Sequence, residues 1–304
     1  MSDSPSPAPA DPGGHRLKAI AYVCLAVVGF TTIDVCAKWL NPHIGTLQTT
    51  YLRYVSALFW ILPFINPWMV PNLFKSERPG LQLARGLLLL NSTWMNFIAI
   101  QYLQLSQTVS IGFMAPLMVS LLAGPLLGEW AGPRRLAAIA IGFLGILIIT
   151  RPGSGAIHPA ALLSVVGMFG YACLLLMTRR LAAVDSAETT FFYSSLTGAV
   201  ILTPFALADW HSPSTLTQWA VVALCGFGGA AGHWLLIQAQ RFTDAPVLAP
   251  FLYTQILWMT VSGYLFFGDV PDRWTLLGAA IVIASGLYIL HRERVRALES
   301  RGWR

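Results

Sequence analysis

Apolar residues are gathered into long runs along the chain, separated by short polar or Gly/Pro-rich stretches. A helix of about 20 apolar residues spans the hydrocarbon core of a bilayer. The runs are continuous and lack the period-two alternation of barrel strands. The pattern therefore predicts an all-α integral membrane protein. Its ten transmembrane helices are expected at residues 17–39, 46–66, 82–102, 107–127, 134–151, 158–179, 188–208, 217–238, 245–267 and 273–291.

The two ends of the chain lack this pattern. Residues 1–14 are rich in Pro, Ser and Ala, so a disordered N-terminal tail is expected there. Residues 293–304 contain several arginines and are expected to form a basic cytoplasmic tail. The helices between these ends divide into two five-helix units, residues 15–153 and 154–292.

The two halves resemble each other at a shift of about 140 residues. The matched pairs are Gly29 and Gly170, Lys38 and Arg179, Thr49 and Thr190, Pro63 and Pro204, Asn96 and His233, Pro116 and Pro250, and Glu129 and Asp269. Their common order indicates a duplicated five-helix unit. Because five is odd, the two units are expected to have opposite orientations in the membrane. Inverted repeats of this kind are typical of secondary transporters.

Composition supports the membrane prediction and excludes several classes of protein. Hydrophobic residues make up 56% of the 304 residues and charged residues 11%, against about 25% charged in soluble domains. A soluble enzyme and a disordered regulator do not fit these values. The formal net charge of +6 would suit a nucleic-acid binder. A membrane protein with basic cytoplasmic loops has the same charge and also fits the apolar composition. No nucleic-acid partner is expected.

The distribution of basic residues predicts the topology. With ten helices, fifteen of the 19 Lys and Arg residues fall on one face, three on the other, and Arg53 within a helix. Positively charged loops remain in the cytoplasm, so both termini are expected there.

Motifs for catalysis, metals or nucleotides are not found in the sequence. No hydrolase, metalloprotease or ATP-binding motif occurs, so no catalytic residue, metal or cofactor is expected. The four cysteines lie in apolar runs and are interpreted as small buried hydrophobic residues. They are Cys24, Cys36, Cys173 and Cys225.

Several motifs carry a resemblance to a known family. They are Asp34-Val-Cys-Ala-Lys38 with Arg53, Arg85, Gly128-Glu129, Gly142-Phe-Leu-Gly145, Arg151-Pro-Gly153, Ala249-Pro-Phe-Leu-Tyr253 and Phe267-Gly-Asp269. With them, residues 17–292 resemble the drug/metabolite transporter superfamily, the group with EamA-type domains. The Asp34–Arg53 region and Phe192-Tyr-Ser-Ser195 are similar to bacterial S-adenosylmethionine carriers. The resemblance implies a ten-helix carrier of the bacterial inner (plasma) membrane, with a central cavity between its halves.

Charged residues inside the predicted helices are the first site candidates, since each costs about 2.5–3.5 kcal/mol on insertion scales. Asp34 and Lys38 are four positions apart and share a helix face. Arg53 enters from the same side, about two turns into the second helix. Two interpretations remain open: a substrate site for a carboxylate or zwitterion, or a structural ion pair with Lys38 at the interface.

Polar residues at matched positions give further candidates. Asn96 and His233 would contact substrate from the two halves or form an interhelical hydrogen bond. Pro116 and Pro250 would kink the fourth and ninth helices near the site, as a kink-and-gating pair. Tyr253 follows Pro250 by about one turn.

The remaining candidates are side chains expected to line the cavity beside these residues. An aromatic ring can offer a cation–π surface to an amine or sulfonium group. Packing or lipid contact is the alternative for each aromatic residue. The candidates are Tyr54, Trp94, Tyr171 and Gln255.

The sequence therefore favours a secondary transporter that moves a small polar metabolite by alternating access. S-adenosylmethionine, an amino acid or a related amine or zwitterion is the expected substrate. Alternatives are an exporter or exchanger of carboxylates or drug-like compounds, a membrane-embedded enzyme, and a channel or structural protein. The expected partners are the substrate and the lipid bilayer, and the sequence leaves a homodimer open.

Overall fold

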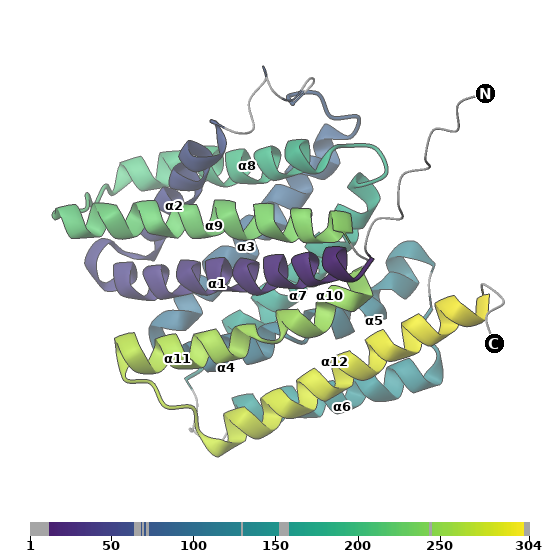
Figure 1. The fold of residues 1–304 in the computed structure, drawn as a ribbon. Coiled ribbons are helices and arrows are strands. Elements are labelled where there is room, and N and C mark those ends of the chain that lie inside the picture. Colours follow the sequence, from purple (N-terminus) through teal and green to yellow (C-terminus); the bar gives the residue numbers. More distant parts are fainter. Residues whose placement is uncertain are drawn as a thin grey trace, which may run out of the picture.

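The computed structural model describes residues 12–63, 68, 70, 73–128, 130–151, 158–242 and 245–300. This part of the chain forms twelve helical segments and no strand (Figure 1). The segments are α1 (Pro12–Ile44), α2 (Thr46–Ile61), α3 (Pro79–Tyr102), α4 (Leu105–Gly112), α5 (Ala115–Leu127), α6 (Pro133–Thr150), α7 (Ala161–Leu181), α8 (Ala187–Ala208), α9 (Leu216–Phe242), α10 (Ala245–Leu252), α11 (Gln255–Phe267) and α12 (Arg273–Ser300).

The twelve segments amount to ten helices, as the sequence predicts. Only two residues separate α4 from α5, and only two separate α10 from α11. Among the described residues, eight helices are long and apolar enough to cross a membrane, with 105–126 counted as one. The α2 helix, with 16 residues, is shorter than these eight. The all-α prediction is confirmed.

The two broken helices are a feature that the hydrophobic pattern does not predict. The expected helix 107–127 is interrupted at Phe113–Met114, and 245–267 at Tyr253–Thr254. Neither break coincides with a proline. Pro116 lies in the first turn of α5, after its break, whereas Pro250 lies inside α10, before its break. The two prolines therefore occupy different places in their helices.

The ends of the described chain are more helical than the expected tails. The first helix begins at Pro12, within the segment 1–14, and proline suits the first turn of a helix. Residues 1–11 lie outside the described part. The last helix continues to Ser300, through most of 293–304, and residues 301–304 lie outside the description. The first turn of α1 and the last turn of α12 lie at the same end of the molecule (Figure 1).

The second half of the chain repeats the helix boundaries of the first. The segments α10, α11 and α12 begin 140 positions after α4, α5 and α6. Gly128 and Gly268 end α5 and α11 with left-handed φ angles of 77° and 68°. Glycine adopts this conformation without the steric cost that a Cβ would bring. The repeat predicted from sequence thus extends to helix ends and their caps.

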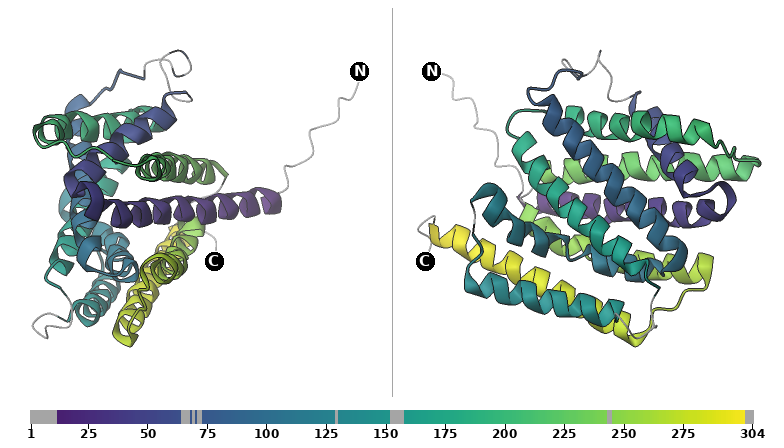
Figure 2. Two further views of the ribbon diagram at one scale, coloured as in Figure 1. Left: turned by 90° about the vertical axis from the view of Figure 1, so that its left-hand side faces the viewer. Right: turned by 180° about the vertical axis from the view of Figure 1, so that it is seen from behind.

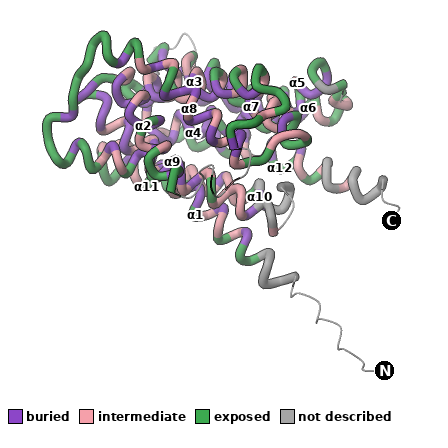
Figure 3. The backbone as a smooth tube through the Cα atoms, turned by 90° about the horizontal axis from the view of Figure 1, so that it is seen from above, coloured by how far each residue is buried: buried purple, intermediate pink, exposed green. Residues whose placement is uncertain are grey.

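Helices from the two halves pack against each other throughout the bundle. The first helix lies along α9, and α7 lies along α3, while α6 pairs with α12 (Figure 2). The α1–α9 contact is so close that a Cβ added to Gly29 would lie 2.8 Å from the carbonyl oxygen of Gly228. Seen from above, α1 leads out of the bundle on one side (Figure 3).

Candidate functional site

Asp34 and Asn96 join α1 to α3 in the interior of the bundle. The Asn96 side-chain amide donates a hydrogen bond to the Asp34 carboxylate over 2.9 Å. Both side chains are half-buried. Two site residues predicted from different helices are therefore in direct contact.

Arg53 is a buried cation without an ion pair in the described structure. Its residue is only 7% exposed, and its guanidinium carbon lies 4.5 Å from the ring centroid of Tyr54. The Nε donor is buried and has no hydrogen-bond partner in the part of the chain that the structure describes. One terminal nitrogen lies beside Gly229 of α9, 4.0 Å from the position of an added Cβ. The charge of Arg53 acts on Asp34, although no hydrogen bond joins the two among the described residues.

His233 lies between aromatic rings of α1 and α8. Its ring centroid is 5.1 Å from that of Phe30 and 5.1 Å from that of Phe191. The imidazole has no hydrogen bond to a described residue, and it is within electrostatic reach of Arg53 and Arg85. The Phe30 and Asp34 side chains are four positions apart and share one face of α1. That face of α1 therefore carries the Phe30 ring one turn from the Asp34 carboxylate.

Arg85 is an interior cation that the sequence analysis does not select as a site residue. Its Nε donates to the Thr178 hydroxyl over 2.6 Å, and one terminal nitrogen contacts the Thr190 carbonyl and the Ser194 hydroxyl. The sequence pattern predicts that the third helix begins at residue 82, which places Arg85 near one of its ends. The helix begins at Pro79, so Arg85 lies well inside it. Pro79 could have indicated the earlier start of this helix, because proline is common in the first turn.

Lys38 is not part of the charged group at Asp34. Its ammonium forms an ion pair of 2.6 Å with Asp269 and donates to the Leu103 carbonyl over 2.9 Å. It also lies 5.0 Å from the ring centroid of Phe267. These contacts tie α1 to the end of α3 and to the α11–α12 connection. Lys38 therefore pairs with Asp269, and among the described residues it takes no part in the expected ion pair with Asp34 and Arg53.

The three aromatic candidates lie in different surroundings. Tyr54 is 1% exposed and donates its hydroxyl to Thr93 over 3.1 Å, so its ring supports Arg53 from within the core. Trp94 is 38% exposed and lies two positions from Asn96, on the opposite side of α3. Tyr171 is 36% exposed and lies within electrostatic reach of Arg85.

Tyr253 and Gln255 lie at the break between α10 and α11. The Tyr253 ring packs edge-on against Phe113, with centroids 4.9 Å apart. Its hydroxyl is buried and bonds to no described residue, and a Cβ on Gly286 would lie 2.0 Å from it. Gln255 is half-buried at the start of α11. The described contacts place Tyr253 in the packed core and not beside Asp34.

The two prolines and Glu129 complete the sequence candidates. Pro116 and Pro250 are exposed, so neither ring is enclosed by the described interior. Glu129 lies outside the described residues. Among the residues that are described, no group of three His, Cys, Asp or Glu could hold a metal ion.

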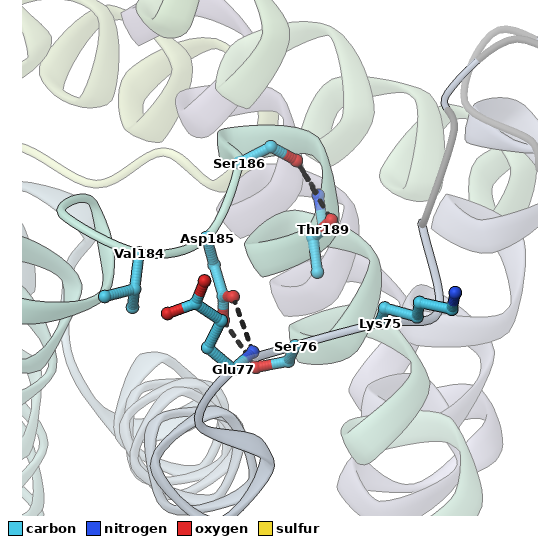
Figure 4. A pocket seen from close by; sticks show the side chains of 7 residues that line it. All are labelled: Lys75, Ser76, Glu77, Val184, Asp185, Ser186 and Thr189. Atoms are coloured by element: carbon cyan, nitrogen blue, oxygen red, sulfur yellow. Dashed lines mark hydrogen bonds between the residues drawn. The ribbon is translucent and has the colours of Figure 1, made fainter.

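A surface pocket lies away from this site, between the α2–α3 and α7–α8 connections (Figure 4). Asp185 accepts hydrogen bonds there from Ser76, Gln82 and the backbone of Glu77. Desolvation raises the pKa of Asp185, but these bonds outweigh it and hold the pKa below its ordinary value. Figure 4 shows Lys75 pointing away from this group. In this pocket the Asp185 carboxylate therefore links the α7–α8 connection to the α2–α3 connection.

Among the described residues, the interior thus has two arginines without ion pairs, Arg53 and Arg85, together with the hydrogen-bonded carboxylate of Asp34 and the imidazole of His233 between aromatic rings. Charges inside transmembrane helices face bundle interiors or cavities and mark substrate pathways. The fold and these residues define a multi-pass membrane protein with a polar internal site.

Comparison with known proteins agrees with this class. The model of the EamA-like transporter family matches residues 17–151 and 158–290. The chain belongs to this family, and it is a multi-pass integral membrane transporter of small metabolites and not an enzyme. The two matched regions correspond to the two halves of the chain.

Named relatives carry different substrates. The S-adenosylmethionine uptake transporter of Rickettsia bellii is 28% identical over 90% of this chain and 94% of its own. The riboflavin transporter of Vibrio cholerae is 28% identical over 94% of this chain and 97% of its own. The pseudopaline exporter CntI of Pseudomonas aeruginosa is 25% identical over 88% and 93%.

A protein of known crystal structure shares the fold. It superimposes with a TM-score of 0.54 at 14% sequence identity, over 95% of this chain and 98% of its own. At this identity the similarity concerns the fold alone.

Proposed function

We propose that the protein is a secondary carrier for a metabolite with an α-amino acid group, moved by alternating access. The observation that carries the proposal is the buried guanidinium of Arg53, which forms no ion pair with a described residue and lies within electrostatic reach of the Asp34 carboxylate. A cation and an anion that interact electrostatically inside a bundle complement the two charges of a zwitterion.

Arg53 would bind the carboxylate of the substrate. A guanidinium offers several donors in a planar fork that matches a carboxylate, and its Nε has no partner in the described structure. Tyr54 beneath the guanidinium restricts its position. A substrate carboxylate would therefore meet a cation that is already oriented.

Asp34 would bind the ammonium group, while the Asn96 amide orients its carboxylate. Phe30, His233 and Phe191 lie along one side and offer aromatic surfaces to an apolar, ring-containing or sulfonium group. S-adenosylmethionine and amino acids contain such combinations. This supports the substrate class named for the Rickettsia relative, with carboxylate or drug-like export as the alternative.

Alternating access would follow from two inverted five-helix units, residues 15–153 and 154–292. The 140-residue repeat of helix boundaries and the pairing of α1 with α9 and α7 with α3 support this arrangement. Both termini would lie in the cytoplasm, as the basic residues predict. The inner membrane as its location follows from the resemblance to bacterial carriers.

A thermal-shift panel on the purified protein tests the proposal. Ligands that bind the folded state raise the melting temperature, and the panel contains S-adenosylmethionine, riboflavin, amino acids, amines and dicarboxylates. We expect an amino-acid-type ligand to stabilise the native protein and Lys75→Gln, but not Arg53→Ala. Lys75 is an exposed loop residue and controls for the loss of one charge. Stabilisation only by ligands without a carboxylate, or equal stabilisation of Arg53→Ala, would overturn the proposal.

A further inference from the structure

We infer that Gly229 determines the specificity of the proposed site, because its missing side chain lets the carboxylate of an amino-acid substrate reach Arg53. The inference rests on the proposed function and deepens it, since the site would separate amino acids from the corresponding amines. It stands on the surroundings of the glycines in α9, on the donors of Arg53 and on the contacts between α1 and α9.

Close packing explains three other glycines of α9. A Cβ on Gly228 would lie 2.8 Å from the carbonyl oxygen of Gly29. A Cβ on Gly232 would lie 2.8 Å from the ring of Phe30, and one on Gly226 would overlap a serine of α2. None of the three positions could carry a side chain without a shift of its neighbours.

Gly229 differs from these glycines because a side chain would fit there. The described atoms nearest to an added Cβ are Ile33 Cδ1 at 3.6 Å and Arg53 Nη2 at 4.0 Å, both at ordinary van der Waals distance. Alanine is also more favourable than glycine in the interior of a helix. Packing against the described residues therefore does not require glycine at this position. The polar group that a side chain would touch is the guanidinium of Arg53.

The guanidinium of Arg53 has donors available at this place. The residue is only 7% exposed, and neither Nε nor a terminal nitrogen donates to a described residue. The ring of Tyr54 covers one face, with its centroid 4.5 Å from the guanidinium carbon. A carboxylate binds in the plane of a guanidinium, at the edge where the N–H groups point. Gly229 lies beside a nitrogen of that edge, so the glycine is next to the place where the substrate carboxylate would bind.

Contacts between α1 and α9 hold Gly229 in this position. One turn before it, the Cys225 thiol lies 3.8 Å from the carbonyl oxygen of Ile33. One turn after it, the His233 ring packs against Phe30 with 5.1 Å between centroids. The two helices are therefore joined on both sides of Gly229, and a side chain at this position would remain against the guanidinium.

A methyl group at position 229 would compete with the substrate carboxylate. A carboxylate oxygen must come within about 2.7–2.9 Å of a guanidinium nitrogen to form a charge-assisted hydrogen bond. A methyl carbon 4.0 Å from Nη2 leaves no room for that oxygen on the same side. An amine without a carboxylate does not use Arg53 and would be unaffected.

Pairs of ligands that differ only in the carboxylate test the inference. The pairs are S-adenosylmethionine and its decarboxylated form, tryptophan and tryptamine, and methionine and 3-(methylthio)propylamine. Melting temperature and equilibrium binding are measured for the full native chain, Gly229→Ala, Gly228→Ala and Gly112→Ala, the last at a glycine with nothing within 4 Å of an added Cβ. We expect the native protein and Gly112→Ala to bind at least one acid about tenfold more tightly than its amine, as a charged hydrogen bond would give.

Gly229→Ala without ligand should melt at the native temperature or above it, because alanine favours the helix. It should bind acid and amine within about threefold of each other, with affinity for the amine retained. Gly228→Ala should melt at a lower temperature, since its Cβ would meet a backbone oxygen.

A melting temperature of Gly229→Ala as low as that of Gly228→Ala would make Gly229 a packing residue and overturn the inference. An undiminished preference for the acid in a stable Gly229→Ala would also overturn it and leave the proposed function standing. If the native protein binds no acid more tightly than its amine, the proposed function fails and this inference with it.

Discussion

Neighbouring residues fix the positions of the charged side chains of Arg53 and Asp34. Tyr54 supports the guanidinium from below, and Gly229 leaves room for it beside α9. Asn96 donates to Asp34 across the α1–α3 contact. A charged group in a low-dielectric interior needs such orientation, because reorganising around the substrate would cost binding energy.

Removing the Asn96 amide should weaken transport while leaving the fold intact. Asn96→Ala deprives the Asp34 carboxylate of its hydrogen bond, and a hydrogen bond to a charged group contributes about 1.5–3 kcal/mol. We expect a fall of about 10-fold or more in transport efficiency, measured by uptake into proteoliposomes at matched protein amounts. Trp94→Leu, on the opposite face of the same helix, is the control and should transport normally. Equal activity of the two variants would contradict the role given to Asn96.

At this scale the sequence identifies isolated polar residues but not their partners. Asp34, Arg53, Asn96 and His233 stand out because their neighbours are apolar, and the structure brings Asp34 and Asn96 into contact. The partner of Lys38 is 231 positions away, so no local spacing indicates it.

At the level of the helices, glycines set how closely α1 and α9 approach. A Cβ on Gly29 would lie 2.8 Å from the Gly228 oxygen and 3.1 Å from the Gly232 Cα. Both are backbone atoms and cannot rotate away. Close packing of this kind is how helices associate in a membrane, where no hydrophobic force acts between them.

Gly29→Ala should therefore separate the two helices. Overpacking of a filled contact costs about 1–3 kcal/mol, and we expect a lower melting temperature in detergent. The matched control is Gly112→Ala at the end of α4, where nothing lies within 4 Å of an added Cβ. An unchanged melting temperature for Gly29→Ala would show that the helices are not in the contact described.

The Lys38–Asp269 ion pair should respond to charge exchange. Its side chains are 13% and 22% exposed, so a lost partner leaves a poorly solvated charge. Lys38→Glu and Asp269→Lys should each lower stability and transport, and the double variant should recover most of both. A double-mutant cycle of melting temperatures and uptake measures this coupling. A double variant as impaired as the sum of the singles would argue against the pair.

Helix existence follows from hydrophobicity, but helix interruptions do not. The break at Tyr253–Thr254 between α10 and α11 lies in apolar sequence without a glycine or proline beside it, whereas Gly112 and Pro116 flank the break between α4 and α5. The two breaks are also in contact with each other, through the rings of Phe113 and Tyr253, and this tertiary contact could not be predicted from the sequence.

For the whole molecule, the repeated helix boundaries and the basic residues together predict the orientation in the membrane. The connection between α7 and α8 should face the cytoplasm, and the connection between α8 and α9 should face outwards. The repeat could be predicted from sequence because equivalent residues recur in order. The pairing of helices between the halves required the structure.

Cysteine labelling tests this orientation. In a background without Cys24, Cys36, Cys173 and Cys225, Ser212→Cys and Ala183→Cys place one exposed thiol in each connection. A membrane-impermeant maleimide added to intact cells should label Ser212→Cys at once and Ala183→Cys only after permeabilisation. The reverse pattern would invert the topology, and labelling of both in sealed cells would contradict it.

Counterflow in proteoliposomes tests the central claim, a carrier whose internal site binds an amino-acid-type substrate through Arg53. Vesicles loaded with unlabelled ligand identified in the binding panel receive labelled ligand outside. The account predicts transient accumulation of label by the native protein and by Lys75→Gln, and none by Arg53→Ala. Equilibration without accumulation would indicate a channel, and accumulation by Arg53→Ala equal to that of the native protein would contradict the site.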